Sequence, residues 1–526
     1  MPGVLLGIGG LLSDPACCII RDGLIASAVE QLKVARQDRP GEFPDKAFHM
    51  ALRTAEVEPH EIKCVAIARP FALGPESNAQ LEFRNRFPEA EIVIVEHHDA
   101  HAASAYYASG FNQAAVLSVD RAGDFRSGAL YSGGQNQLTR VRELYFPDSL
   151  GDLFNRVTEL LGFEPRADEH KVQWLSTSGQ PRYIDVFRSI LHPDAAGWPH
   201  IKRAFFDSDR LTKGGFSECF YREAGVRSGD PLPDDVKADI ASSLQASVGE
   251  VVKGMLGEHT QHVAVAGGLF LNALLVRTLE QEFSNVFVQP ASGNAGTALG
   301  AALFAFHNFC RDLTPVPFTT LYLGPEYSDR QIKQVLENCK LRFRYILTDS
   351  ELINEAIGAL ADNKIIAWMQ GRLEFGPRAL GNRSILASPL NPYSTENLNV
   401  YIKHREGFRK FAASVPEELA SEYFHVGPNA RYLATVGEVK PRYRMQFAPA
   451  ILGESLVRVH TVRREDNPLF HELLLAAGRS SGLPVLYNTS FNLFGDPLVC
   501  TPRDAVRSFF SSGIDALFAG HFYLEK

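Results

Sequence analysis

The sequence predicts an α/β fold, because short apolar blocks typical of buried strands alternate with helix-like stretches. The first block covers residues 4–8, and residues 16–20 form a second block after a glycine-containing turn. Two later blocks cover residues 114–120 and 263–268, and a helix-like segment follows the second of them. These blocks end in acidic or Gly-Gly turns, where main-chain amides can approach phosphates closely.

Length and composition predict a multidomain globular protein. A chain of 526 residues is expected to form two or three domains, and the proline-containing break at residues 313–317 divides it into domains at 1–315 and 316–526. The net charge of −8 argues against nucleic-acid binding, and no apolar run is long enough to span a membrane. Seven scattered cysteines and the lack of a signal-peptide pattern favour the cytoplasm.

Two histidines four residues apart indicate a metal site. His97 and His101 would project from one face of a helix, which suits a single metal ion. Asp120, at the end of the block at 114–120, is a plausible third ligand. Two histidines and one carboxylate leave positions open for substrate, as catalytic metal sites do. The alternative is a pair of ordinary histidines.

The second half contains a cluster of cations in glycine-punctuated sequence. Arg378 and Arg383 lie within residues 375–384, with Asn382 and Ser384 beside them, and Lys403, Arg405 and Arg409 follow soon after. Arginine forks bind phosphate oxygens, so the cluster predicts an anion site, with surface salt bridges as the alternative. Near the C-terminus, Asn488, Ser490 and Asn492 could hydrogen-bond a nucleotide or a carbamoyl group, or could simply form a turn.

These motifs together resemble the NodU/CmcH family of carbamoyltransferases along nearly the whole chain. The matching pieces follow the family's order: His97-His98-Asp99-Ala100-His101, Ala266-Gly267-Gly268 with Asn272, Gly293-Asn294-Ala295-Gly296, residues 374–386, Lys403-His404-Arg405-Glu406, residues 464–468, and Asn488-Thr489-Ser490-Phe491-Asn492.

The resemblance implies an N-terminal domain of the actin/hexokinase-like class, similar to the tRNA threonylcarbamoyl-transfer enzyme, and a C-terminal YrdC-like α/β domain. It implies that the YrdC-like half makes carbamoyl-adenylate from carbamoyl phosphate and ATP with Mg²⁺. The other half would pass the carbamoyl group to a hydroxyl or amine of a small-molecule acceptor. It further implies Fe(II), or another divalent ion, at His97, His101 and Asp120.

The resemblance also assigns residues to the nucleotide and carbamoyl groups. They are Gly267, Gly268, Asn272, Asn294, Arg378, Asn382, Arg383, Ser384, Lys403, Arg405, Arg409, Asn488, Ser490 and Asn492. Lys171, near Glu169, matches a further family stretch and is a catalytic candidate. The alternative is that Lys171 has no catalytic role and simply braces the cleft.

Several departures from the family pattern fall in the N-terminal domain. Ser13-Asp14 replaces the usual His-Asp, so Asp14 becomes the candidate base for acceptor activation, because a serine is no base near neutral pH. Asn294 replaces an aspartate that is the usual fourth metal ligand. Arg121 follows Asp120 where glycine is usual, and Glu30-Gln31-Leu32-Lys33 replaces Glu-Glu-Glu-Arg.

These departures leave two hypotheses. In the first, the protein is a working carbamoyltransferase with a rebuilt acceptor site. In the second, the altered N-terminal half leaves an adenylating half-enzyme or a non-catalytic partner in biosynthesis. Net acidity and the Gly-Pro-Arg element disfavour a tRNA-modifying role. The sequence does not define the acceptor or the oligomeric state.

Overall fold

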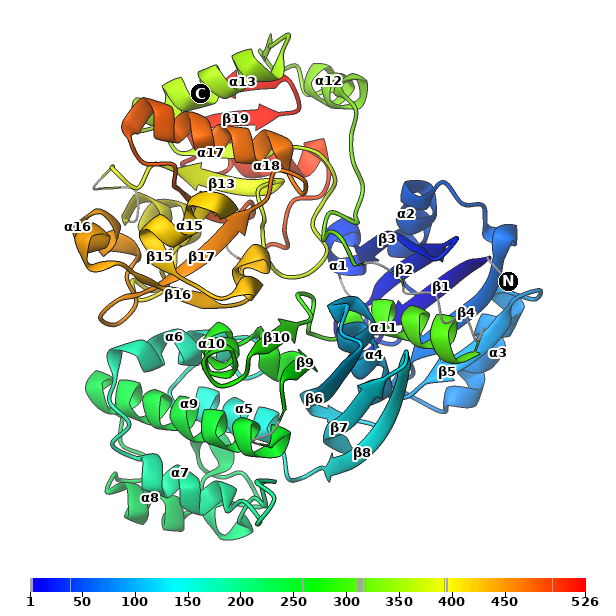
Figure 1. The fold of residues 1–526 in the computed structure, drawn as a ribbon, viewed down its shortest axis with the longest axis vertical. Coiled ribbons are helices and arrows are strands. Elements are labelled where there is room, and N and C mark those ends of the chain that lie inside the picture. Colours follow the sequence, from blue (N-terminus) through cyan, green and yellow to red (C-terminus); the bar gives the residue numbers. More distant parts are fainter. Residues whose placement is uncertain are drawn as a thin grey trace. The chain divides into compact units, whose positions relative to one another are not determined.

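The computed structural model describes residues 3–37, 39–257, 260–309, 316, 318–391, 393, 396–493 and 495–526. They form two compact units, one of residues 1–94 and 294–526 and the other of residues 95–293. Most of the break expected at residues 313–317 lies outside the described residues, so the boundary at 315 stays a prediction. Figure 1 labels the elements of both units.

The first sheet belongs to the first unit and is built around β1. Its strands lie in the order β3 (Leu24–Glu30), β2 (Ala16–Arg21), β1 (Val4–Gly9), β4 (Ile62–Ala68) and β5 (Glu91–Val95). β1 pairs antiparallel with β2 and parallel with β4. We call this sheet and its helices the first lobe. The helices are α1 (Gln31–Ala35), α2 (Asp45–Ala55), α3 (Glu76–Arg86) and α11 (Gly296–Phe304).

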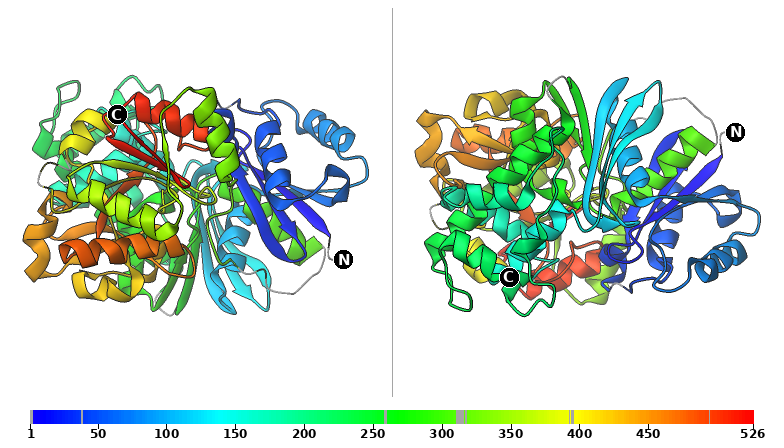
Figure 2. Two further views of the ribbon diagram at one scale, coloured as in Figure 1. Left: turned by 90° about the horizontal axis from the view of Figure 1, so that it is seen from above. Right: turned by 90° about the horizontal axis from the view of Figure 1, so that it is seen from below.

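Glycines in β1 let α11 lie directly on the sheet, as Figure 2 shows for the first lobe. A Cβ at Gly7 would stand 2.1 Å from the carbonyl oxygen of Ala298, and one at Gly9 would stand 2.2 Å from Oγ1 of Thr297. Leu6 and Ile8 point to the opposite face, into the core that α2 covers. The alternation of glycine and large apolar residues therefore builds both faces of β1.

The second unit repeats the strand order of the first sheet. Its strands lie in the order β10 (Asn285–Val288), β9 (His262–Ala266), β6 (Gln113–Gly123), β7 (Arg126–Gly134) and β8 (Gln137–Tyr145). β6 pairs antiparallel with β7 and parallel with β9, as β1 does with β2 and β4. The helices are α4 (His97–Ser109), α5 (Leu150–Leu160), α6 (Glu169–Leu175), α7 (Ile184–Leu191), α8 (Glu218–Ala224), α9 (Asp234–Leu256) and α10 (Ala273–Glu282).

The C-terminal part of the first unit is built on a ten-stranded sheet. Its strands lie in the order β11 (Arg344–Tyr345), β20 (Phe522–Glu525), β19 (Ala516–Ala519), β12 (Ile366–Met369), β13 (Arg383–Ala387), β18 (Leu486–Ser490), β14 (Ala412–Pro416), β17 (Leu456–Val462), β16 (Val436–Val439) and β15 (Phe424–His425). The helices are α12 (Asp329–Asn338), α13 (Asp349–Ala361), α15 (Glu417–Tyr423), α16 (Arg444–Phe447), α17 (Pro468–Ser481) and α18 (Pro502–Phe510).

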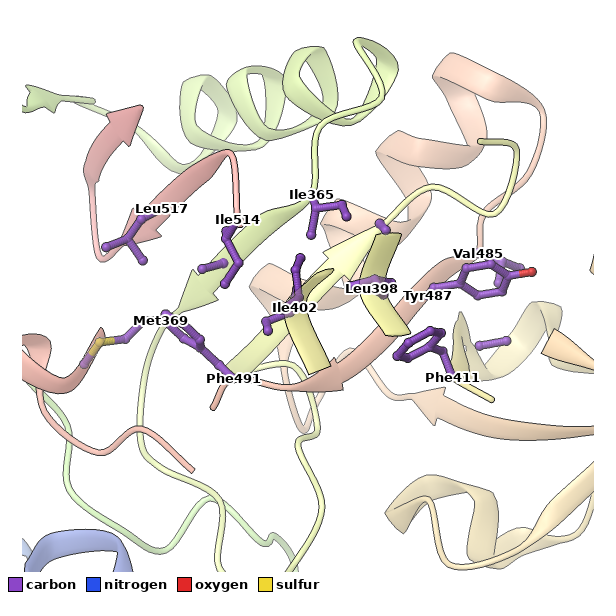
Figure 3. Packing of buried hydrophobic residues seen from close by; sticks show 14 of the residues in the cluster. Ile365, Met369, Leu398, Ile402, Phe411, Val485, Tyr487, Phe491, Ile514 and Leu517 are labelled. Atoms are coloured by element: carbon purple, nitrogen blue, oxygen red, sulfur yellow. The ribbon is translucent and has the colours of Figure 1, made fainter. Parts of the chain in front are cut away.

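Alternating side chains of this sheet build a core on each face. Ile366 and Trp368 of β12 pack with residues of α13 and α17. Ala367 and Met369 point to the other face, where Ile402 belongs to the same core (Figure 3). The strands β12, β13, β14 and β19 are buried along their whole length, as two covered faces require.

The predicted α/β class is confirmed. The blocks expected at residues 4–8, 16–20 and 114–119 are strands β1, β2 and β6, and the block at 263–268 supplies β9. Two sheets with one shared strand order agree with the expected actin/hexokinase-like half. In the described part of the chain, no helix has both the length and the apolar character needed to cross a membrane.

Candidate functional site

The two predicted metal-ligating histidines lie in the first turns of α4. The helix begins at His97, whose backbone N–H donates to the Asp124 carboxylate at 2.8 Å. Asp124 belongs to the β6–β7 turn, and a Cβ on its neighbour Gly123 would stand 2.1 Å from the His97 ring. The turn can lie this close to His97 only because residue 123 is glycine.

His97, His101 and Asp120 come together as predicted. Nε2 of His97 lies 3.1 Å from Oδ2 of Asp120, and Nε2 of His101 lies 3.3 Å from the same oxygen. The potential ligand atoms all lie within 4.8 Å of one another. Two imidazoles and one carboxylate in this arrangement fit a divalent first-row metal ion.

The surroundings of this cluster favour the ligand-competent forms of its residues. Burial alone would raise the pKa of the Asp120 carboxyl, but the hydrogen bonds and charge of His101 and His97 hold it well below its usual range. His98 contacts Ser118 at 2.8 Å through Nδ1. Burial and the two neighbouring histidines keep the pKa of His98 well below its usual value, so this ring stays neutral.

The predicted nucleotide loop lies beside the metal cluster within the second unit. Gly267 has a φ of +102°, and a Cβ there would meet the Val119 carbonyl oxygen at 2.1 Å. A Cβ on Gly268 would stand 3.0 Å from Oδ1 of Asp120. Asn272 caps α10 by accepting hydrogen bonds from two backbone N–H groups of its first turn. The glycines thus bring main chain against the proposed metal ligand.

Lys171 has a structural partner in the residue that precedes its own helix. Its ammonium lies 2.9 Å from the Asp168 carboxylate and over the ring of Phe163. The Glu169 carboxylate accepts a hydrogen bond from the backbone N–H of Arg166 at 2.6 Å. These contacts agree with the bracing alternative, and the catalytic assignment of Lys171 stays a prediction.

Two of the departures from the family pattern contact each other. Nδ2 of Asn294 donates to Oγ of Ser13 at 2.6 Å. The neighbouring Asp14 is exposed at the tip of the β1–β2 loop. A neutral hydrogen bond therefore stands where the family pattern has a histidine and an aspartate, and the two changes form one local exchange.

Four of the predicted cations gather into one cluster in the C-terminal part. Arg378, Lys403, Arg405 and Arg409 interact electrostatically with one another, and burial together with this mutual repulsion lowers the pKa of Arg378, Lys403 and Arg405. Lys403 is only 6% exposed. Arg378, Arg405 and Arg409 are half-buried, and Arg409 lies 3.6 Å from the Glu406 carboxylate. Like charges partly withdrawn from water are costly unless anions offset them, so the cluster has the character of an anion site.

Arg458 belongs to the same cluster and was missed by the sequence analysis. Burial and the charges of Arg378, Arg405 and Arg409 lower its pKa well below the usual value. It lies on β17, paired with Ala412 of β14. No motif surrounds Arg458 in the sequence. Its one signal is a cation within a strand that is otherwise largely apolar, at 456–462.

The C-terminal polar box meets Lys403 directly. Nζ of Lys403 donates to Oδ1 of Asn492 at 2.7 Å and to the carbonyl oxygens of Ser490 and Asn492. Lys403 ends the π-helical segment Asn397–Lys403, whose Leu398 and Ile402 enter the core near Tyr487 (Figure 3). The apolar residues of this segment therefore fix the position of the lysine.

The other residues of the glycine-punctuated motif hold the turn itself. Oε1 of Glu374 accepts hydrogen bonds from the backbone N–H groups of Leu380, Asn382 and Arg383 at 2.8–3.0 Å. Arg383 begins strand β13, is fully buried and donates to the carbonyl oxygens of residues 370 and 371. The side chain of Ser384 accepts from the N–H of Gly381. We call residues 374–383 the anion turn, because it carries Arg378.

Asn488 connects this turn to the neighbouring strand. It is 2% exposed, and its Nδ2 donates to the carbonyl oxygen of Ala379 at 3.2 Å and to Oγ of Ser414 at 3.1 Å. Asn488, Ser490 and Asn492 therefore all lie near the cation cluster or the turn that carries it, as the resemblance implies.

Comparisons with known proteins identify relatives of this chain. Residues 77–303 match the family model of the carbamoyltransferase N-terminus, and residues 357–526 match that of the carbamoyltransferase C-terminus. The nodulation protein NolNO of Sinorhizobium fredii is 31% identical over 556 residues, which cover 98% of this chain and 79% of that protein. A 3'-hydroxymethylcephem-O-carbamoyltransferase of Amycolatopsis lactamdurans is 30% identical over 67% of each chain. A structure of HypF from T. kodakarensis is 15% identical, with a TM-score of 0.34, over 57% of this chain and 47% of that one.

The chain belongs to the carbamoyltransferase family and is an enzyme of this type.

Proposed function

We propose that the protein is an ATP-dependent carbamoyltransferase that acts on a small-molecule hydroxyl through carbamoyl-adenylate. Carbamoyl phosphate would lose phosphate to water, and an oxygen of the resulting carbamate would attack the α-phosphorus of ATP as pyrophosphate leaves. The acceptor oxygen would then attack the carbamoyl carbon, pass its proton to a base and release AMP.

The cation cluster of Arg378, Lys403, Arg405, Arg409 and Arg458 is the observation that carries the proposal. Two highly charged substrates, carbamoyl phosphate and ATP, must come together for adenylate formation. Cations that are partly withdrawn from water offset the charge of these substrates and of the leaving pyrophosphate more strongly than fully exposed cations do, because water screens them less.

The cluster of His97, His101 and Asp120 supports the transfer step, because its donor set suits Fe(II) or another divalent ion. When bound, such an ion would polarise the carbamoyl carbonyl. The protein's own residues would orient the adenylate through the loop at Gly267 and Gly268. Asp14, exposed on the β1–β2 loop, is the proposed base for the acceptor proton.

A hydroxyl acceptor is preferred over an amine because the cephem relative is, by its name, an O-carbamoyltransferase. A hydroxyl needs a base in the transition state, and a carboxylate placed beside it is sufficient. Loop side chains define the acceptor pocket, so acceptors are to be found by screening rather than by fold analogy.

The test uses purified protein with carbamoyl phosphate and ATP, without any acceptor. We expect pyrophosphate release together with about one bound metal ion per chain. Pyrophosphate release without metal would favour the adenylating half-enzyme, whose marks would be Ser13 and Asn294. No pyrophosphate release would refute the proposed adenylate chemistry.

A further inference from the structure

A buried lysine of the first lobe contacts the anion turn of the C-terminal part, inside the first unit. Lys33, on α1, is 6% exposed. Its Nζ donates to the carbonyl oxygen of Gly376 at 2.6 Å and to that of Glu374 at 3.0 Å. These two carbonyls flank Phe375 and lie just before Arg378. A charged lysine this deeply buried costs free energy unless its partners hold it in place.

Glu30 completes the contact from the other side. Its carboxylate forms an ion pair with Lys33 and accepts a hydrogen bond from the N–H of Gly376 at 3.3 Å. Both main-chain polar groups of Gly376 are therefore held by one pair of side chains. Gly376 has a φ of +105°, a conformation that strains other residues, so this pair fixes an unusual point of the turn.

Val34 of α1 and Arg36, directly after this helix, contact the same region. Val34 packs against a small buried cluster that includes Leu373, just before the anion turn, and Ala379, within it. Arg36 donates to the carbonyl oxygen of Leu498 at 2.9 Å, and Leu498 belongs to the same cluster. The contact is therefore a packed surface with a charged centre.

The other end of α1 is fixed to the loop that carries the candidate base. The N–H of Gln31 donates to the carbonyl oxygen of Pro15 at 2.7 Å. Glu30 is paired with Ala16 across β2 and β3. Asp14 directly precedes Pro15 and Ala16. A single short helix therefore joins the anion turn to the β1–β2 loop.

We infer that Lys33 is a positioning residue that, with Glu30, holds the anion turn so that Arg378 stays within the cation cluster. The inference rests on the proposed function. Among the described residues, the hydrogen bonds and the ion pair of the Lys33 ammonium go to main-chain carbonyls of the turn and to Glu30, so Lys33 acts through the turn. Through α1, Lys33 also fixes the position of the β1–β2 loop relative to that turn.

The experiment compares Lys33→Met, Lys33→Arg and Lys63→Met in the full-length protein, with pyrophosphate release followed at varied carbamoyl phosphate. Lys33→Met should raise KM about tenfold or more while kcat falls less, because the phosphate-binding arginine is misplaced. Lys33→Arg restores a cation of similar reach and should recover most of the loss. Lys63 is exposed on β4 of the same lobe, so its variant should match the wild type.

The outcomes separate the inference from the proposed function. A wild type that releases no pyrophosphate contradicts the proposed function. An active wild type with an unchanged KM in Lys33→Met overturns the inference alone, as does an equal loss in Lys33→Arg and Lys33→Met. If Lys33→Met does not fold, Glu30→Gln decides. A raised KM supports the inference, and a wild-type KM overturns it.

Discussion

His97, His101 and Asp120 were predictable because each depends on local sequence. Four-residue spacing puts two side chains on one helical face. The apolar run at 114–119 predicts a strand, and Asp120 directly follows this run, within the last residues of β6. Arg458 was not predictable, because it joins the cluster through the pairing of β17 with β14. In this pairing Arg458 lies opposite Ala412, which is 46 residues earlier in the chain. Such pairings depend on tertiary structure, which no local motif records.

The first prediction concerns the metal cluster. His101→Ala removes one of three ligands from a buried site, and metal binding should weaken by about 100-fold or more. Elemental analysis after dialysis, with thermal denaturation with and without chelator, measures the loss. His49→Ala, at an exposed position of α2, is the matched control. Retention of a full equivalent of metal by His101→Ala would show that the three residues are not the site.

The second prediction concerns Arg458. Arg458→Met removes one of several repelling cations, so without anions the variant should be as stable as the wild type or slightly more stable. The rise in Tm caused by ATP should shrink, because a phosphate-binding charge is gone. Pyrophosphate release should fall about tenfold or more. Calorimetry with and without ATP tests this, and an undiminished ATP effect would remove Arg458 from the anion site.

At the scale of elements, apolar patterning predicted the strands well, whereas the motifs predicted the roles of individual residues less well. The motif around Arg383 was interpreted as one glycine-punctuated turn. In the structure the strand β13 begins at Arg383, and the guanidinium of this arginine donates hydrogen bonds to main-chain carbonyl oxygens. Residue type alone could not separate Arg383 from Arg378, because both are arginines in the same motif. Burial and the direction of each side chain distinguish them.

The third prediction concerns how closely β1 and α11 pack. Gly7→Ala would place a methyl group 2.1 Å from the Ala298 carbonyl oxygen, so the helix must shift. We expect a loss of about 1–3 kcal/mol of unfolding free energy, measured by denaturant titration. Gly134→Ala, at the end of β7, meets nothing within 4 Å and should change stability far less. Equal stability of Gly7→Ala and wild type would mean that α11 is not seated on β1 in this way.

At the scale of the whole molecule, the chain order conceals how the parts associate. The boundary expected at the break at residues 313–317 lies largely outside the described residues and stays a prediction. The described residues form a continuous unit, 95–293, inserted between two segments of the other. Local composition marks breaks in the chain but not long-range packing. The contacts of Lys33 with residues more than 300 positions away illustrate this, since the sequence shows only an altered family motif at residues 30–33.

The last prediction uses this organisation. Residues 95–293 contain a complete five-stranded sheet, its covering helices and all three proposed metal ligands. A fragment of these residues should therefore fold and bind a divalent ion, since the cluster needs no residue from the other unit to supply its three donors. Circular dichroism and metal content of the fragment, beside its His101→Ala variant, measure both properties. A fragment that folds but binds no metal would show that these three donors are not sufficient. By contrast, a fragment of residues 1–94 alone should not fold, because Lys33, Val34 and Arg36 would lose their partners in the C-terminal part.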